Sequence, residues 1–444
     1  MTQLGQKIAV IGSGISGLSA AWLLSRAHEV TLYEAEPRLG GHTNTVEAPG
    51  GDGAAIPVDT GFIVYNEKTY PNLTALFAHL GVETRGTDMS FAVSLRGGAL
   101  EYGSTSLNAI FAQRRNLFSP RFLLMLRDLT RFYKSAPADL ADDCGGLSLG
   151  DYLARKGYGS AFQEDHLLPQ AAAIWSSSAA DIRDYPAAAF VRFFDNHGLL
   201  ELDVHARPQW RTVLGGSRRY IPHLTAPLQD RIITGTSVTA LRRDTAGVTV
   251  HDAAGGARRF DQVVVATHAN QALNLLAEPS PQERAVLGAF RYTHNTAVLH
   301  TDLRLMPRHR AAWSAWNYVG DNARGGEVTY WMNLLQGLES PEPLLVSLNP
   351  ATPPDPAKVL RTEAYEHPLF DHASMAAQQH LWSLQGVNRT WFCGAHFGAG
   401  FHEDGLQAGL AVAEAIGGVR RPWTVENESG RIRVGPALAQ ATAA

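Results

Sequence analysis

Apolar runs, a glycine-containing turn and a second apolar run follow one another closely at the start of the chain. Residues 7–11 (KIAVI) are the β-branched and apolar residues typical of a short buried strand. Residues 18–26 are rich in Ala, Leu and Trp, a composition that favours a helix. Residues 30–33 are again strand-like and end at Glu34. This order of strand, turn, helix and strand predicts a βαβ unit.

A similar passage lies near the end of the chain. Residues 390–395 (TWFCGA) form a strand-like run that contains a glycine, and further glycines lead into the Ala- and Leu-rich residues 406–416. Between the two passages, residues 232–250 resemble a β-hairpin and residues 261–267 (DQVVVAT) a buried strand. The recurrence of strand and helix patterns indicates an α/β protein.

Composition and charge exclude several classes of protein. Of the 444 residues, 45% are hydrophobic and 18% charged, so the chain is globular, and its length predicts two or three domains. A net charge of -4 gives no reason to expect nucleic-acid binding. Two cysteines, Cys144 and Cys393, are too few for a disulfide framework or a zinc motif. No apolar run reaches the roughly 18 residues of a membrane-spanning helix, and we expect a cytoplasmic protein.

The turn in the opening βαβ unit has the glycine spacing of a dinucleotide-binding loop. Gly12 permits the tight turn, Gly14 allows the backbone to approach a pyrophosphate, and Gly17 allows close packing of helix and strand. The N-terminus of the helix offers free N–H groups and a positive dipole end to the phosphates. Glu34 stands where a carboxylate accepts hydrogen bonds from an adenosine ribose. The alternative is a glycine-rich turn in a nucleotide-free α/β protein.

The segments that follow resemble one family of nucleotide-binding proteins. Residues 38–41 (RLGG) lie just after Glu34, residues 58–62 (VDTGF) form a second glycine turn, and residues 215–220 (GGSRRY) place a glycine pair before a helix. With the C-terminal passage, these motifs resemble the flavin-containing amine oxidase and phytoene desaturase-like superfamily over residues 7–417. The resemblance implies FAD as cofactor and a p-hydroxybenzoate hydroxylase-like α/β fold, in which a Rossmann-type FAD-binding domain accompanies a discontinuous α+β substrate domain.

The resemblance also assigns cofactor contacts to individual positions. It implies that the Arg-x-Gly-Gly element contacts the diphosphate and the flavin edge, and that the C-terminal passage covers the ribityl chain. The chain departs from the family after the C-terminal glycine, because Ala395 and His396 stand where an acidic residue is usual. The expected FAD contacts are Gly12, Gly14, Ile15, Ser16, Gly17, Glu34, Ala35, Arg38, Gly40, Gly41, His42, Gly61, Phe62, Val238, Gly394, Ala395, Gly405 and Leu406.

The same resemblance divides the chain into interleaved domains, and no internal repeat or low-complexity run separates them. The FAD-binding domain is expected to comprise residues 1–90, 210–285 and 385–420. The substrate domain is expected to comprise residues 91–209 and 286–384, followed by a loosely held C-terminal tail over residues 421–444.

The substrate half is apolar and lacks the lysine typical of amine oxidases. Amine oxidases of the family generally carry a lysine in the second substrate segment, but no lysine occurs between Lys156 and Lys358. A single aromatic residue is more often ordinary core than a ligand contact, whereas the aromatic set as a whole favours a lipophilic ligand. The set comprises Trp175, Phe190, Phe193, Phe194, Phe290, Tyr292, Trp313, Trp316, Tyr318, Tyr330 and Trp331.

One segment, Asn108–Lys134, combines bulky apolar residues with basic ones. It holds six cations and a single acid, Asp128. Such a composition is typical of an interfacial helix that docks on anionic lipid. The alternative is a pair of substrate-domain helices whose arginines are merely solvated. We expect peripheral contact with an anionic membrane at its inner surface and no nucleic-acid partner; a homo-oligomer is one of the oligomeric states left open.

Several stretches narrow the resemblance to a bacterial subgroup. Residues 40–45 (GGHTNT), 58–66 (VDTGFIVYN), 172–176 (AAIWS) and 397–405 (FGAGFHEDG) are similar to the methylated unsaturated acyl-lipid desaturases of furan fatty acid biosynthesis. This resemblance implies FAD-dependent removal of two hydrogens beside a methyl-branched double bond, which gives a conjugated diene on a phospholipid acyl chain. Alternatives are a flavin-dependent fatty acid double-bond isomerase, an amine oxidase, and a non-catalytic flavin-containing lipid-binding protein.

Candidates for the proton-removing group lie in the glycine-rich segment expected beside the flavin. They are His402, Glu403 and Asp404, and an imidazole titrates in the range that suits a general base. Alternatively, His402 is a hydrogen-bonded loop residue that shapes the flavin site. No metal-binding motif occurs, so no metal site is expected. Weaker candidates near the pocket are Trp175, Ser176, His166 and His197.

Overall fold

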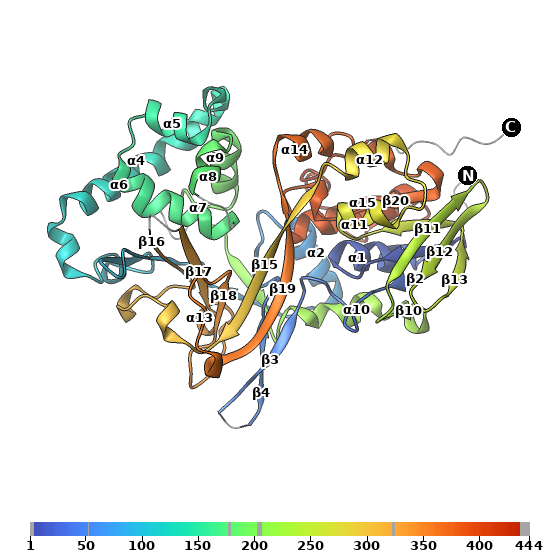
Figure 1. The fold of residues 1–444 in the computed structure, drawn as a ribbon, viewed down its shortest axis with the longest axis horizontal. Coiled ribbons are helices and arrows are strands. Elements are labelled where there is room, and N and C mark those ends of the chain that lie inside the picture. The colour runs from blue at the N-terminus through green and yellow to red at the C-terminus, as the bar shows by residue number, and fades with distance from the viewer. Residues whose placement is uncertain (1–3, 52, 176–178, 202–206, 322–324, 436–444) are drawn as a thin grey trace.

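A parallel sheet assembled from distant parts of the chain carries the glycine turn. The structure is a computed structural model that describes residues 4–51, 53–175, 179–201, 207–321 and 325–435. Five strands pair in parallel in the order β10-β2-β1-β14-β20 (Figure 1). They are β1 (Lys7–Ile11), β2 (Glu29–Tyr33), β10 (Ile232–Ile233), β14 (Gln262–Val265) and β20 (Thr390–Phe392). The central strands β1 and β14 are almost wholly buried, as expected for a parallel sheet between helices.

Two helices contact each other closely beside this sheet. They are α1 (Ile15–Leu24), in which every residue is buried, and α15 (His402–Ile416). A Cβ at Gly405 would lie 2.8 Å from Ser16 Oγ, and a Cβ at Gly409 would lie 2.2 Å from the Ser16 carbonyl oxygen. The two glycines therefore let α15 approach α1 more closely than other residues would allow. This contact brings the N-terminal ends of both helices to one place.

Smaller elements surround the parallel sheet. An antiparallel sheet is formed by β11 (Val238–Asp244), β12 (Gly247–Asp252) and β13 (Ala257–Phe260). Two more small sheets consist of β3 (Thr45–Pro49) with β4 (Ala55–Asp59), and of β5 (Tyr65–Asn66), β9 (Trp210–Val213) and β6 (Thr84–Thr87). The helices of this part are α2 (Pro71–Leu80), α10 (Ile221–Thr225), α11 (Ala269–Leu275), α12 (Pro281–Leu287) and α14 (His372–Gln378).

A second large sheet forms the centre of the other half of the molecule. Its seven strands run in the order β19-β15-β18-β17-β16-β7-β8, and most neighbours are antiparallel. They are β7 (Phe91–Leu95), β8 (Leu100–Gly103), β15 (Arg291–His300), β16 (Trp316–Asp321), β17 (Gly325–Trp331), β18 (Leu345–Leu348) and β19 (Val359–Leu369), with the short helix α13 (Met332–Leu335) after β17. The long strands β15 and β19 reach from this sheet toward the parallel sheet (Figure 1).

A group of helices lies beside the seven-stranded sheet and has its own core. Phe132, Phe162, Phe190 and Phe194 are fully buried in that core. In the described part of the chain, no helix is long and apolar enough to cross a membrane. The helices are α4 (Pro120–Asp139), α5 (Leu149–Arg155), α6 (Ser160–Phe162), α7 (Leu168–Trp175), α8 (Ala179–Asp184) and α9 (Ala187–Asn196), with a π-helical turn at Gln163–Leu167 between α6 and α7.

The described part of the C-terminal tail corrects an expectation. Residues 421–435 are not loosely held: Arg421 is 2% exposed and forms an ion pair with Glu414, and Ile432 is buried. Arg431 Nε lies 2.7 Å from Asp404 Oδ1. Two carboxylates of α15, Glu414 and the buried Asp404, thus hold the tail through its arginines, a pairing that the local composition does not reveal. Residues 436–444 lie outside the described residues.

The strands of the two large sheets come from interleaved parts of the chain. All five strands of the parallel sheet fall within residues 1–90, 210–285 and 385–420. All seven strands of the second sheet fall within residues 91–209 and 286–384. The interleaving places a cavity where the two halves meet.

Candidate functional site

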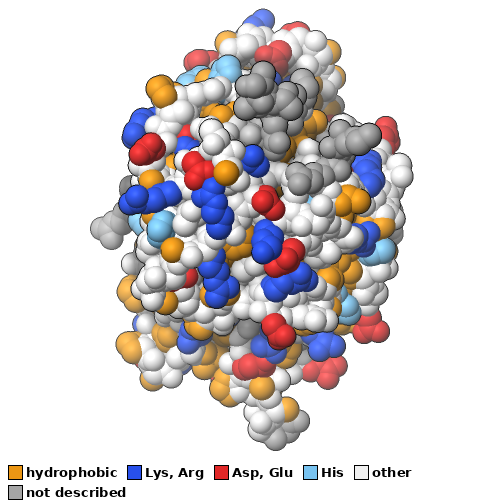
Figure 2. All heavy atoms as spheres, turned by 90° about the vertical axis from the view of Figure 1, so that its right-hand side faces the viewer, with side chains coloured by type: hydrophobic (Ala, Val, Ile, Leu, Met, Phe, Trp, Pro, Cys, Tyr) orange, Lys and Arg blue, Asp and Glu red, His pale blue; other side chains and the backbone are white. Residues whose placement is uncertain are grey.

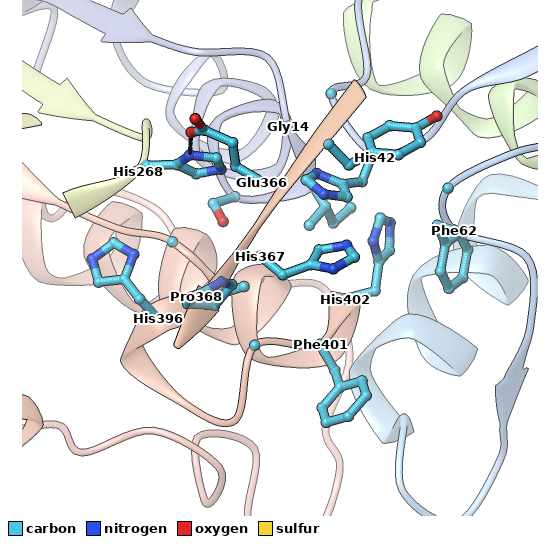
Figure 3. A pocket seen from close by; sticks show the side chains of 18 of the residues that line it. Gly14, His42, Phe62, His268, Glu366, His367, Pro368, His396, Phe401 and His402 are labelled. Carbon is cyan, nitrogen blue, oxygen red and sulfur yellow. Dashed lines mark hydrogen bonds and ion pairs between the residues drawn. The ribbon is translucent and has the colours of Figure 1, made fainter. Parts of the chain in front are cut away.

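One large cavity, with a volume of about 910 Å³, is walled by residues of both halves (Figure 3). We call nucleotide wall the part formed by Gly12–Ser16, Glu34–Glu36, Gly40–His42, Thr236–Val238 and Gly394–His396. We call apolar wall a second part in which Gln170 and His197 are the polar members. It is formed by Ile63, Val64, Met89, Phe91, Gln170, Ala173, Ile174, Phe193, His197, Leu199, Trp210, Trp316, Tyr330, Leu335 and Leu348.

The glycine turn is built as its sequence predicts. Gly12 has φ +99°, a conformation that favours glycine. A Cβ at Gly17 would lie 1.9 Å from the Gly12 carbonyl oxygen, so this position requires glycine for close packing. Gly14 differs: a Cβ there would meet no protein atom within 4 Å, because the residue faces the cavity at the N-terminus of α1. Only Gly14 of the three therefore leaves room for a ligand.

Glu34 lies on the nucleotide wall just after β2. Its Oε2 accepts hydrogen bonds from the Ser13 backbone N–H (2.9 Å) and from Ser13 Oγ (2.5 Å), and its Oε1 accepts one from the Glu36 N–H. The carboxylate is thereby fixed beside the glycine turn. Val238, at the start of β11, lines the same wall. This is the arrangement that a ribose-binding carboxylate next to an adenine-binding strand needs.

The glycine pair Gly40–Gly41 packs on the turn that contains Gly12 and Gly14. A Cβ at Gly41 would lie 3.2 Å from Gly14 Cα, and the Phe62 N–H donates to the His42 carbonyl oxygen at 2.7 Å. Arg38 does not line the cavity; its Nη1 donates to the Gly41 carbonyl oxygen at 2.8 Å. In this structure Arg38 therefore holds the glycine pair, and its contact with the cofactor stays a prediction.

Most of the expected FAD contacts come together in the cavity, and a few lie behind it. Gly17, Gly405 and Leu406, like Arg38, do not line it: Gly17 packs on Gly12, Gly405 packs on α1, and Leu406 is fully buried. The expected contacts that do line it are Gly12, Gly14, Ile15, Ser16, Glu34, Ala35, Gly40, Gly41, His42, Gly61, Phe62, Val238, Gly394 and Ala395.

Six histidines line the cavity. His197 belongs to the apolar wall, and the other five, His42, His268, His367, His396 and His402, are labelled in Figure 3. The ring centroid of His42 lies 5.3 Å from that of His367 and 6.5 Å from that of His268. Burial, with a smaller effect of the neighbouring histidines, lowers the pKa of His42 to about 3, and burial lowers the pKa values of His396 and His402 to about 3 as well. These imidazoles are therefore neutral at neutral pH, and each keeps a lone pair for a proton or a hydrogen bond.

His402 is the first residue of α15 and lines the cavity. Its ring stacks on Phe62 with centroids 3.8 Å apart, and its Nε2 lies 2.9 Å from the Tyr220 hydroxyl, which in turn contacts Thr43 Oγ1. In the described part of the chain, His402 Nδ1 has no hydrogen-bond partner. Stacking on Phe62 and the hydrogen bond with Tyr220 thus hold the ring in one orientation, and Nδ1 remains without a partner among the described residues.

The structure does not support Glu403 and Asp404 as proton acceptors in the cavity, because neither lines it. Glu403 is fully buried and accepts hydrogen bonds from the Asn72 and Leu73 backbone N–H groups at 3.1 and 2.9 Å, which caps α2. Asp404 accepts from the Phe401 N–H at 2.7 Å and pairs with Arg431. Both carboxylates serve the packing of helices. Their roles rest on partners far away in the sequence.

The aromatic set divides between core and cavity. Phe190 and Phe194 are core, and Trp313 packs edge-to-face on Trp331 outside the cavity. Ser176 and the side chain of Trp175 lie outside the described residues. The members that line the cavity are Phe193, Tyr292, Trp316 and Tyr330.

His166 is a structural histidine, not a cavity residue. Its Nδ1 lies 3.0 Å from the Tyr102 hydroxyl, which itself donates to the Asp165 carbonyl oxygen, and its Nε2 lies 3.1 Å from the Tyr133 hydroxyl. Nδ1 therefore donates to Tyr102, and Nε2 accepts from Tyr133. Burial lowers the pKa of His166 to about 4.

We expect His166 to make the protein less stable in acid. The unfolded chain binds a proton below the ordinary pKa of histidine, whereas the folded chain does so only near its lowered value. Between about pH 7.5 and pH 5.5 this difference removes about 1.3 kcal/mol of unfolding free energy. In urea titrations at both pH values, His166→Gln should reduce the wild-type loss by that amount. An unchanged loss would show that His166 titrates normally in the fold.

The cavity fits FAD on three observations. The open position at Gly14 admits a diphosphate at the N-terminus of α1, where N–H groups and the helix dipole favour an anion. The fixed carboxylate of Glu34 stands ready for ribose hydroxyls. His42 Nε2 and His396 Nε2 are buried without a hydrogen-bond partner in the described residues, so polar groups of a ligand have partners there.

Several residues of the site carry no local sequence signal. Thr43 and Tyr220, which hold His402, are brought together from positions 177 residues apart. Tyr365 and His367 face His42 because alternate residues of β19 point to one side of the strand. By contrast, Gly405 and Gly409 have the four-residue spacing of a close helix contact, and this signal was available in the sequence.

Curated relatives share short stretches of sequence with this chain. A carotenoid phi-ring synthase of Streptomyces griseus is 31% identical over 166 residues, which cover 33% of this chain and 31% of that protein. The chain matches about a third or less of the length of the curated relatives. These relatives alone therefore do not define the activity.

Solved structures and a family model cover more of the chain. Wild-type putrescine oxidase bound to putrescine has a TM-score of 0.64 at 15% identity, covering 93% of this chain and 99% of that one. A CLA-producing fatty acid isomerase from P. acnes has the same TM-score and identity, covering 93% and 98%. The model for flavin containing amine oxidoreductases matches residues 15–300. Because this match spans more than half of the sequence, the chain belongs to the flavin containing amine oxidoreductase family.

Proposed function

We propose that this FAD-dependent oxidoreductase desaturates a methyl-branched unsaturated acyl chain of a membrane phospholipid, a step of furan fatty acid biosynthesis. The observation that carries the proposal is the apolar wall, which continues the cavity beyond the nucleotide wall. The similarity of residues 40–45 and 397–405 to acyl-lipid desaturases supplies the substrate class.

The apolar wall suits a long hydrocarbon chain. Trp316 and Tyr330 pack edge-to-face with centroids 4.7 Å apart, and Phe91 and Leu348 extend the same surface. Burying a methylene group in such surroundings contributes about 0.8 kcal/mol. An acyl chain with many methylenes therefore gains affinity along its whole length, whereas a short polar substrate gains little.

The charges around the cavity do not suit an amine. Among the described lining residues the only acids are Glu34 and Glu36, on the nucleotide wall, and Glu366, which pairs with His268 and His294 at 3.0 and 3.1 Å. No carboxylate belongs to the apolar wall as defined above, and no lysine lines the described cavity. An ammonium group there would be desolvated without a counter-charge, which is unfavourable.

The residues of the site are consistent with removal of a hydride and a proton. Bound FAD supplies the two-electron acceptor for the hydride. The proton leaves from the neighbouring carbon, and its electron pair forms the new double bond. We assign this proton to His402, which lines the cavity: when its Nε2–H donates to the Tyr220 hydroxyl, the Nδ1 lone pair is available as the acceptor. The surrounding apolar side chains exclude water from the reacting carbons.

One solved structure with this fold is described as a fatty acid isomerase. The P. acnes structure with this fold is a fatty acid isomerase, so a cavity of this architecture is compatible with an acyl substrate. Isomerisation is redox-neutral, whereas desaturation transfers two electrons. Anaerobic mixing distinguishes the two reactions, because only desaturation leaves the flavin reduced.

We expect binding to strengthen with acyl chain length. Each further methylene that the apolar wall buries should increase affinity about fourfold, until the cavity is filled. Perturbation of the flavin absorption spectrum by saturated acyl phospholipids of increasing length measures this, since such chains bind without reacting at a methyl-branched double bond. Putrescine serves as the control. Affinity that is independent of length, together with flavin reduction by putrescine, would favour an amine oxidase instead.

A further inference from the structure

The segment before and at the start of α4 exposes apolar side chains. It comprises the short helix α3 (Leu107–Ile110), the 3-10 turn Arg114–Phe118 and the first turns of α4. We call residues 107–127 the tip. Phe118 is 85% exposed and Leu107 76% exposed. Of the eleven strongly exposed large hydrophobic side chains among the described residues, the tip contributes Leu107, Leu117, Phe118, Leu123 and Leu124.

The tip is firmly held by its inner face. Phe122 and Met125 of α4 are buried in a cluster that also contains Phe91 and Ala173, two residues of the apolar wall. Ser119 caps α4 by accepting a hydrogen bond from the Phe122 N–H. The exposure of the outer side chains is therefore a property of a well-packed helix. The inner face of the tip therefore packs on residues that line the substrate cavity.

Cations surround the exposed apolar residues. In the described part of the chain, Arg114 and Arg115 have no acidic partner, and Arg115 donates to the Ala99 carbonyl oxygen beside the β7–β8 turn. Arg308 packs against the same turn, at Gly98. Arg121 is partly neutralised, because it pairs with Glu164 and Asp165 on the turn after α6.

Further along α4, Arg127 and Arg131 share one acid, Asp128. The tip and its continuation along α4 thus keep a positive charge even after their ion pairs are counted. The opposite end of the molecule differs: Figure 2 shows Lys and Arg side chains interspersed with Asp and Glu on that face.

We propose that the tip docks the protein on an anionic lipid bilayer, with Phe118 and its apolar neighbours among the acyl chains and the arginines on the lipid phosphates. This inference rests on the proposed function, which places the substrate in a membrane. Apolar side chains flanked by cations are the composition of an interfacial membrane anchor. A second copy of the chain is a poorer occupant, because two facing tips would bring like charges together. In Figure 1 the tip, which includes the first turns of α4, lies at one outer end of the molecule.

Vesicle flotation tests the proposal with the full-length, FAD-loaded protein. Vesicles contain phosphatidylcholine alone or mixed with phosphatidylglycerol, and flavin absorbance in the floated fraction measures binding without any turnover. Wild type should bind only the mixed vesicles, and salt should weaken the binding. Arg114→Gln combined with Arg115→Gln should weaken it roughly 25-fold, about fivefold for each charge. Phe118→Ser should weaken it roughly tenfold or more.

Matched controls are Leu214→Ser and Arg242→Gln, which change exposed residues away from the tip and should bind like wild type. Unchanged flavin content and thermal unfolding confirm that the tip variants fold. Equal binding to both kinds of vesicle, or variants that bind like wild type, would overturn the proposal. So would a wild-type dimer in light scattering that becomes monomeric in Phe118→Ser, because the tip would then join two copies.

The readouts also separate this proposal from the proposed function. If the protein floats with anionic vesicles but never desaturates their lipids, the docking proposal stands and the proposed function is contradicted. If the protein desaturates detergent-dispersed lipid but does not float with vesicles, the proposed function stands and the docking proposal is contradicted.

Discussion

Valine in place of Gly14 is expected to leave the protein folded and to remove its FAD. The backbone at Gly14 has φ -63° and ψ 174°, which any residue adopts, and a Cβ there meets no protein atom within 4 Å. The added methyl groups would instead occupy the cavity at the N-terminus of α1, where the diphosphate is expected. We expect the Kd for FAD to rise about 100-fold or more, as the loss of close backbone approach implies. Titration of the apoprotein with FAD, followed by flavin fluorescence, measures it.

Gly17→Ala is the matched comparison for this variant. Its Cβ would lie 1.9 Å from the Gly12 carbonyl oxygen, so the substitution disrupts the packing of α1 on β1 and should lower the stability of the whole domain. Gly14→Val should therefore retain the wild-type thermal transition of the apoprotein, and Gly17→Ala should not. Full flavin content in purified Gly14→Val would show that the diphosphate does not lie against this residue.

The second large effect concerns His402. His402→Gln should slow reduction of the bound flavin by substrate about 100-fold or more, the usual contribution of a general base, while FAD stays bound. The reason is geometric: His402 lines the cavity, Phe62 and Tyr220 fix its ring, and its Nδ1 has no hydrogen-bond partner among the described residues. Rapid mixing under anaerobic conditions measures the rate constant, and flavin content is measured beside it.

Glu403→Gln provides the contrasting variant next in the sequence. The amide would set an NH₂ group among backbone N–H donors from Asn72 and Leu73, so we expect stability to fall by about 2 kcal/mol. The rate constant per bound flavin should stay near that of wild type, because the side chain does not reach the cavity. A wild-type rate in His402→Gln together with a large loss in Glu403→Gln would reverse these two roles.

The local parts of the site were predictable from the sequence. Gly12, Gly14 and Gly17 act within one turn, and their spacing reflects backbone geometry that only neighbouring residues determine. Glu34 comes directly after the following strand, so its position is set by the same βαβ unit. The strands of the parallel sheet were recognisable from their short β-branched runs.

The remaining parts depend on contacts between distant segments. Glu403 and Asp404 follow a histidine in a glycine-rich stretch and suggested acid–base chemistry, yet their partners are Asn72 and Arg431. No local pattern reveals such pairs, because a carboxylate that caps a distant helix looks like one that faces a ligand. The same holds for Arg38, whose partner is the Gly41 carbonyl oxygen. Only the folded arrangement separates these roles.

The most direct test of the central claim is one anaerobic turnover. Purified protein with bound FAD is mixed, without oxygen, with a phospholipid that carries a methyl-branched monounsaturated chain. We expect flavin absorbance to bleach and mass spectrometry to find one conjugated diene for each flavin reduced. Flavin that remains oxidised while the double bond migrates, or that bleaches with putrescine and not with lipid, would contradict it.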